Sequence, residues 1–201
     1  MKLIRFAVNF LCIWLLGMNL ASAEKFSLVE LSDYFNKLDT FQADFRQFSD
    51  DGSEAKGVIL IKKPGRLRID YEEPEDLLIL GSGGQLAIFD PKGEPEPTSF
   101  PLNVTPFSLV LENSINFVGS SNILSHDFNQ GETSLSLYDP KHPERGYIKL
   151  IFSGKKPVLS RWIIQDESGS ATLMSIERYE ENISLGEMQF NIQLEIERRR
   201  N

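Results

Sequence analysis

The side chains best suited to catalysis are two histidines and several adjacent acidic residues. His126 stands in Ser-His-Asp and His142 in Lys-His-Pro, and neither has neighbours at the spacing of a metal-binding motif. The pairs Glu72-Glu73 and Glu75-Asp76 resemble the two carboxylates of a glycoside hydrolase, but sequence neighbours in a strand point to opposite faces. We therefore expect surface or ordinary strand positions for these residues, and no catalytic role.

Other common motifs of catalysis and cofactor binding are missing from the sequence. No Gly-x-Ser-x-Gly elbow occurs. Gly81-Ser82-Gly83-Gly84 has neither a lysine nor a following helix pattern, so it predicts a hairpin turn and not a phosphate-binding loop. The only cysteine is Cys12. We expect a protein that is not an enzyme and holds no metal and no cofactor.

The first 23 residues are typical of a secretory signal peptide. Lys2 and Arg5 precede the apolar run Phe6–Leu16, and Ala21-Ser22-Ala23 is a small-x-small cleavage pattern. The run is shorter than the ~20 residues of a spanning helix. Bulky residues precede Cys12 where a lipoprotein signal has small ones, so we do not predict lipidation there. We expect a mature chain of residues 24–201.

The mature chain, 178 residues long (201 − 23), suits a single domain with a substantial core. It has no cysteine, so it must be stable without disulfides. Of the 21 basic and 29 acidic residues in the whole sequence, removal of Lys2 and Arg5 leaves 19 and 29, a net charge near −10. So acidic a chain is a poor ligand for nucleic acid or anionic membranes.

A helix is expected first. Ser27 followed by Glu30 forms a capping-box pattern. Apolar residues then recur at steps of three and four, which predicts one helix ending near Ser49. These residues are Leu28, Leu31, Phe35, Leu38, Phe41, Phe45 and Phe48.

Short β-type runs separated by turn residues follow, which predicts an antiparallel meander. The runs are Gly57–Ile61, Leu67–Tyr71, Leu77–Leu80, Gln85–Phe89, Ile123–Phe128, Thr133–Tyr138, Tyr147–Phe152, Val158–Gln165, Thr172–Tyr179 and Phe190–Ile196. The proline-rich stretch up to residue 106 predicts an irregular loop, and Thr105-Pro106-Phe107 predicts the start of a short helix. About ten strands in one sheet should curl, with helices against the concave face.

The block from Ile61 to Pro74 contains two strands around a Lys-Pro-Gly turn. On its second strand, Arg66, Arg68 and Asp70 share one face, and Leu67, Ile69 and Tyr71 share the other. The apolar face could line a cavity for acyl chains or fill a solid core. The alternation is compatible with both.

Several segments of the chain, in the same order, resemble the periplasmic outer-membrane lipoprotein carrier family (LolA). The similar segments are Phe41-Gln42-Ala43-Asp44-Phe45-Arg46-Gln47, the Lys-Pro-Gly-Arg-Leu-Arg block to Tyr71 and Pro74, Gly81 to Pro91, Thr105-Pro106-Phe107-Ser108-Leu109, Leu159 to Trp162, and Asp166 to Thr172. Together they span roughly residues 27–180.

The resemblance implies a mainly β fold with α-helices, an unclosed antiparallel half-barrel of about 10–11 strands lidded by N-terminal and internal helices. It implies a periplasmic chaperone that takes acylated lipoproteins from an inner-membrane ATP-binding-cassette releasing complex and passes them to an outer-membrane receptor. A monomer is expected. The open alternative is a carrier or sensor of another lipid or glycolipid on the same scaffold.

Site residues follow from the same resemblance and from strand alternation. The residues expected to contact lipid on the concave face are Leu67, Ile69, Leu78, Leu80, Leu86, Ile88, Phe107, Leu109 and Val110. Lys63 stands where the family commonly has an arginine that bonds the lid, so we expect weaker lid closure, or compensation by Arg66 or Arg68.

Two further departures from the family concern the cavity and the C-terminus. Ala87 replaces a usual aromatic residue and should enlarge the cavity. The ending from Phe190 to Asn201 does not match the family's usual sequence, which leaves the receptor step open.

Overall fold

One curved antiparallel sheet of 11 strands forms most of the protein, in a computed structural model that describes residues 24–94 and 96–200. The predicted signal peptide therefore lies outside the described residues. The strands are β1 Thr40–Ser49, β2 Glu54–Lys62, β3 Arg66–Tyr71, β4 Leu78–Ser82, β5 Gln85–Phe89, β6 Thr98–Pro101, β7 Ile123–Asn129, β8 Glu132–Tyr138, β9 Tyr147–Ser153, β10 Val158–Gln165 and β11 Ala171–Glu181.

Helical elements are few and short. They are α1 Leu28–Lys37, α2 Ile192–Arg200 and the 3-10 turns η1 Leu102–Val104, η2 Pro106–Leu109, η3 Pro143–Arg145 and η4 Glu187–Phe190. None of the helices in the described ranges is long and apolar enough to span a membrane.

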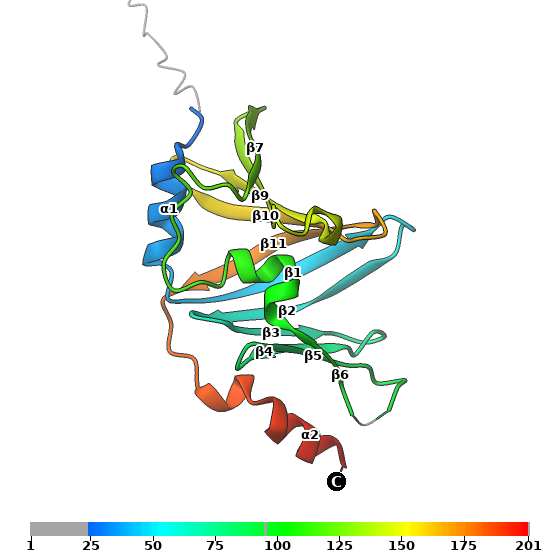
Figure 1. Ribbon diagram of the computed structural model, residues 1–201. Coiled ribbons are helices and arrows are strands. Elements are labelled where there is room, and N and C mark those ends of the chain that lie inside the picture. Colours follow the sequence, from blue (N-terminus) through cyan, green and yellow to red (C-terminus); the bar gives the residue numbers. More distant parts are fainter. Residues whose placement is uncertain (1–23, 95, 201) are drawn as a thin grey trace, which may run out of the picture.

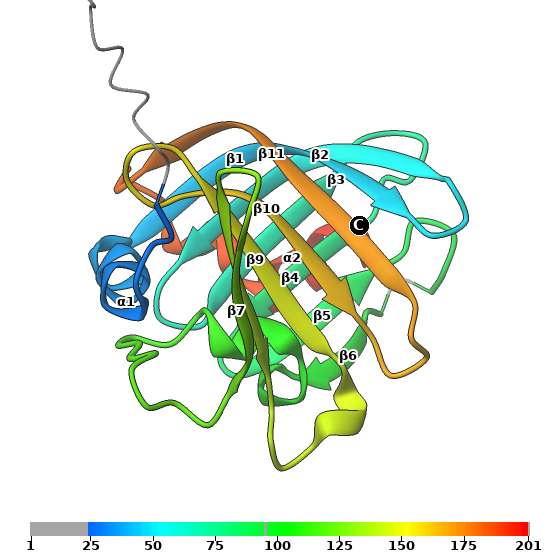
Figure 2. The ribbon, with the colours of Figure 1, turned by 90° about the horizontal axis from the view of Figure 1, so that it is seen from above.

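The sheet does not close into a barrel. Its order is β6-β5-β4-β3-β2-β1-β11-β10-β9-β8-β7, so β6 and β7 are free edges. The two halves of the sheet bend toward each other, with α1 across one end and η1–η2 in the concavity (Figures 1 and 2). The expected half-barrel lidded by an N-terminal and an internal helix is confirmed.

The inner face of the sheet is the one that packs on α1 and η2. Cross-strand partners share a face, so the register identifies inner residues in successive strands. Phe41 opposes Ile61, Leu67 opposes both Ile61 and Gly81, and Ile69 opposes Ile79. These side chains join one large core with Leu31 and Phe35 of α1.

The outer face of β2 to β5 carries a second apolar layer. Leu78, Leu80, Ala87 and Phe89 form a cluster against Ile192 and Ile196 of α2. Nearby, Leu60 packs with Leu185 and Phe190. The C-terminal segment therefore backs this half of the sheet from outside, and α2 lies beneath β3–β6 in Figure 1.

The predicted helix to Ser49 is wrong beyond Lys37. The capping box is present, with Ser27 Oγ accepting from Glu30 N and Glu30 Oε2 accepting from Ser27 N at 2.8 Å. The helix ends at Lys37, and the chain then enters β1, where Phe41, Ala43 and Phe45 are buried at alternate positions. Residues four apart share a face in both a helix and a strand, so the phenylalanine spacing fitted either structure.

Two other segment predictions fail. The stretch Phe190–Ile196 was expected to be a strand, but it contains the end of η4 and most of α2. Ile192 and Ile196, four residues apart, both pack on the outer face. Thr98–Pro101, expected to be loop, forms edge strand β6 against β5. The other predicted strands are all present, within one to three residues at their ends.

Candidate functional site

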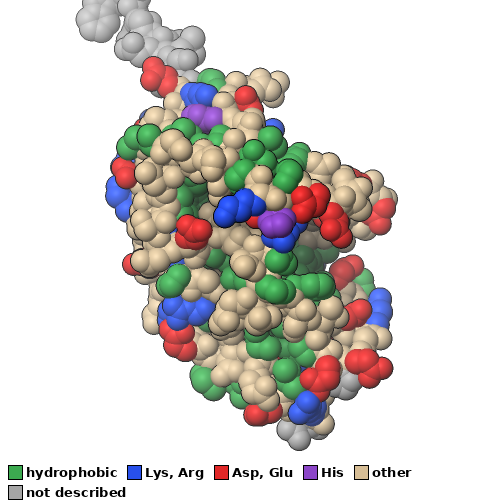
Figure 3. Space-filling view, viewed as in Figure 1, with side chains coloured by type: hydrophobic (Ala, Val, Ile, Leu, Met, Phe, Trp, Pro, Cys, Tyr) green, Lys and Arg blue, Asp and Glu red, His purple; other side chains and the backbone are tan. Residues whose placement is uncertain are grey.

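An apolar cavity of about 30 Å³ lies between the covering elements and the inner face of the sheet. Its walls are Phe35, Leu38, Phe41, Ile61, Lys63, Phe107, Val110, Ile148, Leu150, Leu159 and Trp162. Lys63 is the only charged residue among them. The volume admits one or two water molecules, so in this closed form the cavity cannot hold an acyl chain. The space-filling view, seen from the same side as Figure 1, shows hydrophobic side chains in recesses near the middle of the surface (Figure 3).

The cavity lies between α1 and η2 on one side and strands β1, β2, β9 and β10 on the other. The end of α1 contributes Phe35, and β9 contributes Ile148 and Leu150, which alternate with outward-facing Lys149. The η2 turn supplies Phe107, and its Pro106 occupies the first helical position as the sequence predicts. Thr105 is the N-cap residue, but its hydroxyl donates to Leu102 O at 2.8 Å and does not cap the turn.

The turn between β2 and β3 connects the sheet to both covering elements. Lys63 Nζ donates to the carbonyl oxygen of Phe35 in α1 at 2.8 Å. The amide of Gly65 donates to Leu111 O, just after η2, at 2.9 Å. Burial lowers the pKa of Lys63, while Asp39 and Glu112 act in the opposite direction. The ammonium group is thus the one charge at the border of an apolar space.

The two covering elements are also bound to each other. Asn36 Nδ2 donates to Ile115 O, and Ile115 N donates back to Asn36 Oδ1, both at 2.8 Å. Phe117 N donates to Ser32 Oγ at 2.9 Å. Three hydrogen bonds therefore join α1 to residues 115–117, so α1 and the segment after η2 form a single cover.

Most of the residues expected to contact lipid lie on the inner side. Phe107 and Val110 line the cavity. Leu67, Ile69, Leu86 and Leu109 belong to the same core, although none of them reaches the cavity wall. Ile88 opposes Ile79 and so shares the inner face.

Leu78 and Leu80 do not line the concave face, contrary to the sequence prediction. Their strand partners across β3 are Asp70 and Arg68, which place both leucines on the outer face beneath α2. The apolar run from Leu77 to Leu80 has no alternation, because β4 is covered on both sides, so the sequence could not indicate the face. Ala87 lies in the same outer cluster, so it does not enlarge the cavity.

Arg66 and Arg68 likewise do not reach the cover. Arg66 pairs with Glu187 through Nη1. Arg68 forms a two-point ion pair with Asp70 and donates to Gln189 O at 3.0 Å. Both arginines hold the C-terminal segment on the outer face, so neither compensates for lysine at position 63.

Sequence reasoning missed the β9 and β10 part of the cavity. Ile148, Leu150, Leu159 and Trp162 all lie on strands that the sequence predicts, and their alternation with Lys149 and Arg161 was the available signal. Which of the inward side chains meet a void depends on where α1 ends, and that boundary was predicted wrongly.

The histidines and acidic residues occupy the ordinary positions expected of them. His126 Nε2 lies 2.9 Å from Phe26 O, and its pKa is lowered, mainly by burial and also by nearby Lys25. His142 pairs with Glu144 in an exposed loop. Gly83-Gly84 forms the hairpin turn between β4 and β5. Within the described ranges, no group of three or more potential metal ligands occurs.

Comparison with known proteins gives consistent results. The family model described as outer membrane lipoprotein carrier protein LolA matches residues 36–193. A Nitrosomonas europaea protein named outer-membrane lipoprotein carrier protein is 29% identical, with 77% of this chain and 79% of that one covered. A protein of the same name from Chromobacterium violaceum is 26% identical over 85% of this chain and 84% of its own.

Solved structures support the fold. A putative outer membrane lipoprotein-sorting protein domain from Vibrio parahaemolyticus superposes with a TM-score of 0.51, covering 84% of this chain and 97% of that one. At 9% identity this likeness concerns the fold alone. The half-barrel and its cover are thus an architecture found in other proteins.

Proposed function

This chain belongs to the outer membrane lipoprotein carrier family, and from that membership we propose that it binds the acyl chains of lipoproteins and carries them through the periplasm toward the outer membrane. It acts as a chaperone without catalysing a reaction. Residues 1–23 direct export and are removed. An inner-membrane ATP-binding-cassette complex loads the carrier, and an outer-membrane receptor unloads it.

The observation that carries this proposal is the apolar cavity beneath a discrete cover. Ten of its eleven lining residues are apolar (all except Lys63), so it offers acyl chains an environment that needs no specific hydrogen bonds. Each methylene moved from water into such a space gains about 0.8 kcal/mol. The methylenes of a fatty acyl chain could replace the apolar contacts that the cover makes with the sheet in the closed form.

Binding requires the cover to move, because the closed cavity is only about 30 Å³. The polar contacts that would break are Lys63 to Phe35 O, Gly65 N to Leu111 O, Tyr34 to Glu181 and Asn182 to Lys37 O. The core packing of Leu31, Phe35 and Phe107 would also be lost. Since Asn36 and Ser32 join α1 to residues 115–117, the two parts of the cover would lift together. Closed and open forms then differ in affinity for acyl chains, and partners that favour one form drive loading or release.

Trp162 supplies a built-in reporter for the test. The sequence contains two tryptophans, Trp14 in the predicted signal peptide and Trp162 in the cavity wall, so residues 24–201 have one. We expect a diacylated lipopeptide with a nitroxide in one acyl chain to quench Trp162 saturably, and the same peptide without acyl chains to leave it unquenched.

Two outcomes would count against the proposal. Quenching by diffusion alone, without saturation, would mean that no acyl chain enters the cavity. Saturable quenching by a phospholipid, with none by the lipopeptide, would favour the alternative of a carrier for another lipid. Release of a newly made lipoprotein from spheroplasts as a soluble one-to-one complex is the corresponding cellular measurement.

A further inference from the structure

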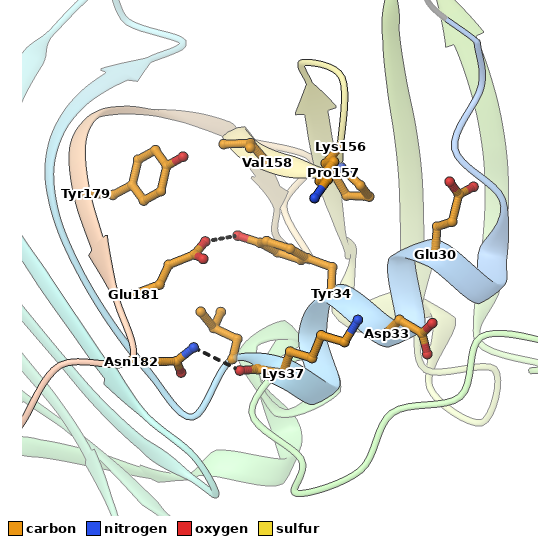
Figure 4. A pocket seen from close by; sticks show the side chains of 11 residues that line it. Glu30, Asp33, Tyr34, Lys37, Lys156, Pro157, Val158, Tyr179, Glu181 and Asn182 are labelled. Carbon is orange, nitrogen blue, oxygen red and sulfur yellow. Dashed lines mark hydrogen bonds between the residues drawn. The ribbon is translucent and has the colours of Figure 1, made fainter.

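A second, larger cavity lies beside the apolar one. It is an open cleft of about 390 Å³ between α1, the β9–β10 turn and the end of β11. Tyr34 projects from α1 across the cleft, and its hydroxyl donates to Glu181 Oε1 at 3.1 Å (Figure 4). Burial, reinforced by the charge of Glu181, raises the pKa of Tyr34, so this hydroxyl stays protonated and remains a donor. The volume is in the range of small-ligand sites.

The cleft and the apolar cavity share a wall. Leu38 lines both spaces. Val158 faces the cleft, and the next residue, Leu159, faces the cavity. Tyr179, in the cleft, stacks on Phe41, in the cavity, with ring centroids 6.0 Å apart. The two spaces are therefore one side chain apart, and displacement of α1 would join them.

Apolar surfaces and unpaired charges alternate around the cleft. Two tyrosine rings, Pro157 and Val158 provide the apolar part. Asp33, Lys37 and Lys156 lie at its edge, and their side chains make no hydrogen bond or ion pair with any other residue in the described ranges. Figure 4 shows Lys37 and Lys156 on opposite sides of the Tyr34 ring. Donors and an acceptor are thus available to a ligand.

We propose that this cleft binds the polypeptide segment that directly follows the acylated residue of the cargo. The inference rests on the proposed function, because acyl chains inside the cavity require the polar remainder of the same molecule to leave through an adjoining opening. An extended peptide presents both carbonyl acceptors and amide donors, which match Lys37, Lys156 and Asp33. Contacts to the backbone would not depend on cargo sequence.

The charges of the cleft argue against a phosphate-bearing lipid headgroup as its occupant. Three carboxylates, those of Glu30, Asp33 and Glu181, stand among its lining residues beside the two lysines. A bound phosphate would lie close to this negative charge, which repels it. A neutral peptide backbone meets no such repulsion.

The test compares two ligands on the folded residues 24–201, both read by quenching of Trp162 with a nitroxide-labelled acyl chain. One is a diacylglyceryl-cysteinyl pentapeptide of uncharged residues, and the other is the same diacylglyceryl thioether without the peptide. In the variant Lys37→Gln/Lys156→Gln, we expect the dissociation constant to rise about fivefold for the lipopeptide and to stay unchanged for the peptide-free lipid.

The matched control is Lys141→Gln/Lys155→Gln, which removes the same charge from exposed positions outside the cleft. It should change neither dissociation constant. Equal loss of both ligands in the cleft variant, or no loss of the lipopeptide, would overturn the inference. Phosphatidylglycerol with the same labelled acyl chain is added as a third ligand, and a loss of affinity seen only with it would assign the cleft to a headgroup instead. Failure of the unaltered protein to bind either diacyl ligand would overturn the proposed function itself.

Discussion

The Nζ atom of Lys63 lies 2.8 Å from the carbonyl oxygen of Phe35, so a side chain at the end of β2 holds the last turn of α1 in place. This carbonyl is at the C-terminal end of the helix, where partial negative charge favours a cation. A single lysine donor thus contacts α1 from the position where the family commonly has an arginine. The contact is direct, and it is made to α1 and not to η2.

Replacement of Lys63 by Met should loosen the cover. Loss of a charge-assisted hydrogen bond costs about 1.5 kcal/mol, which corresponds to a roughly tenfold increase in opening of the last turn of α1. Hydrogen exchange of the amides from Phe35 to Leu38 would measure it. Lys62→Met is the matched control, because Lys62 bonds Leu185 O and Glu187 on the outer face. Unchanged hydrogen exchange in Lys63→Met would show that the bond from Lys63 to Phe35 O does not hold the last turn of α1 in place.

Enlargement of the cavity should increase uptake of apolar molecules. Ile148, on β9, is 1% exposed and lines the cavity, and Ile151 on the same strand is 9% exposed and faces outward. Changing either to Ala should cost about 2–4 kcal/mol of unfolding free energy. Only Ile148→Ala should bind an environment-sensitive apolar dye more tightly. The same gain in both variants would show that general loosening, and not the cavity, takes up the dye.

Sequence reasoning predicted the curved sheet because polar turns and alternating runs mark most strands on their own. It failed where the pattern was ambiguous. Phe41 and Phe45 fit a helix and a strand equally well, and only the end of α1 decided between them. Leu78 and Leu80 lie in a strand covered on both sides, so their orientation depends on register with Arg68 and Asp70. The contact of Lys63 with the cover was expected from the family resemblance alone, because nothing in the local pattern of the Lys-Pro-Gly turn indicates its partner.

The C-terminal segment should stabilise the fold without taking part in acyl-chain binding. Phe190 is 1% exposed and packs with Leu60 on the outer face. We expect Phe190→Ala to cost about 3–5 kcal/mol in urea denaturation, while lipopeptide affinity of the remaining folded protein stays the same. Met188→Ala, at a 61% exposed position in the same turn, should change stability by no more than about 0.5 kcal/mol. Weaker lipopeptide binding in Phe190→Ala would connect the outer face to the cavity.

Stability should fall at alkaline pH because of buried tyrosines. Burial, with the charge of Glu75, raises the pKa of Tyr71 to about 12, and its hydroxyl donates to Gln47 Oε1 at 2.7 Å. The unfolded chain releases this proton near pH 10. The stabilisation is therefore complete below pH 10 and is lost between pH 10 and 12, by about 1.4 kcal/mol per pH unit.

Tyrosinate absorbance would measure this effect. In the native protein Tyr71 and Tyr34 should titrate late, and in urea all tyrosines should titrate together near pH 10. Tyr71→Phe should remove one late group and reduce the alkaline loss of stability. If the number of late-titrating groups stayed the same, the assignment of Tyr71 would be wrong.

The apolar clusters of α2 and η4 on the outer face have a mechanical consequence. The part of the sheet from β2 to β5 is packed from both sides, which makes it a three-layer slab, whereas no described helix joins an outer cluster on β8 to β10. A layer supported on one side bends more easily than one supported on both. When acyl chains fill the interior, strands β8 to β10 should therefore bend outward, while β2 to β5 keep their shape. The cavity would then expand on one side only.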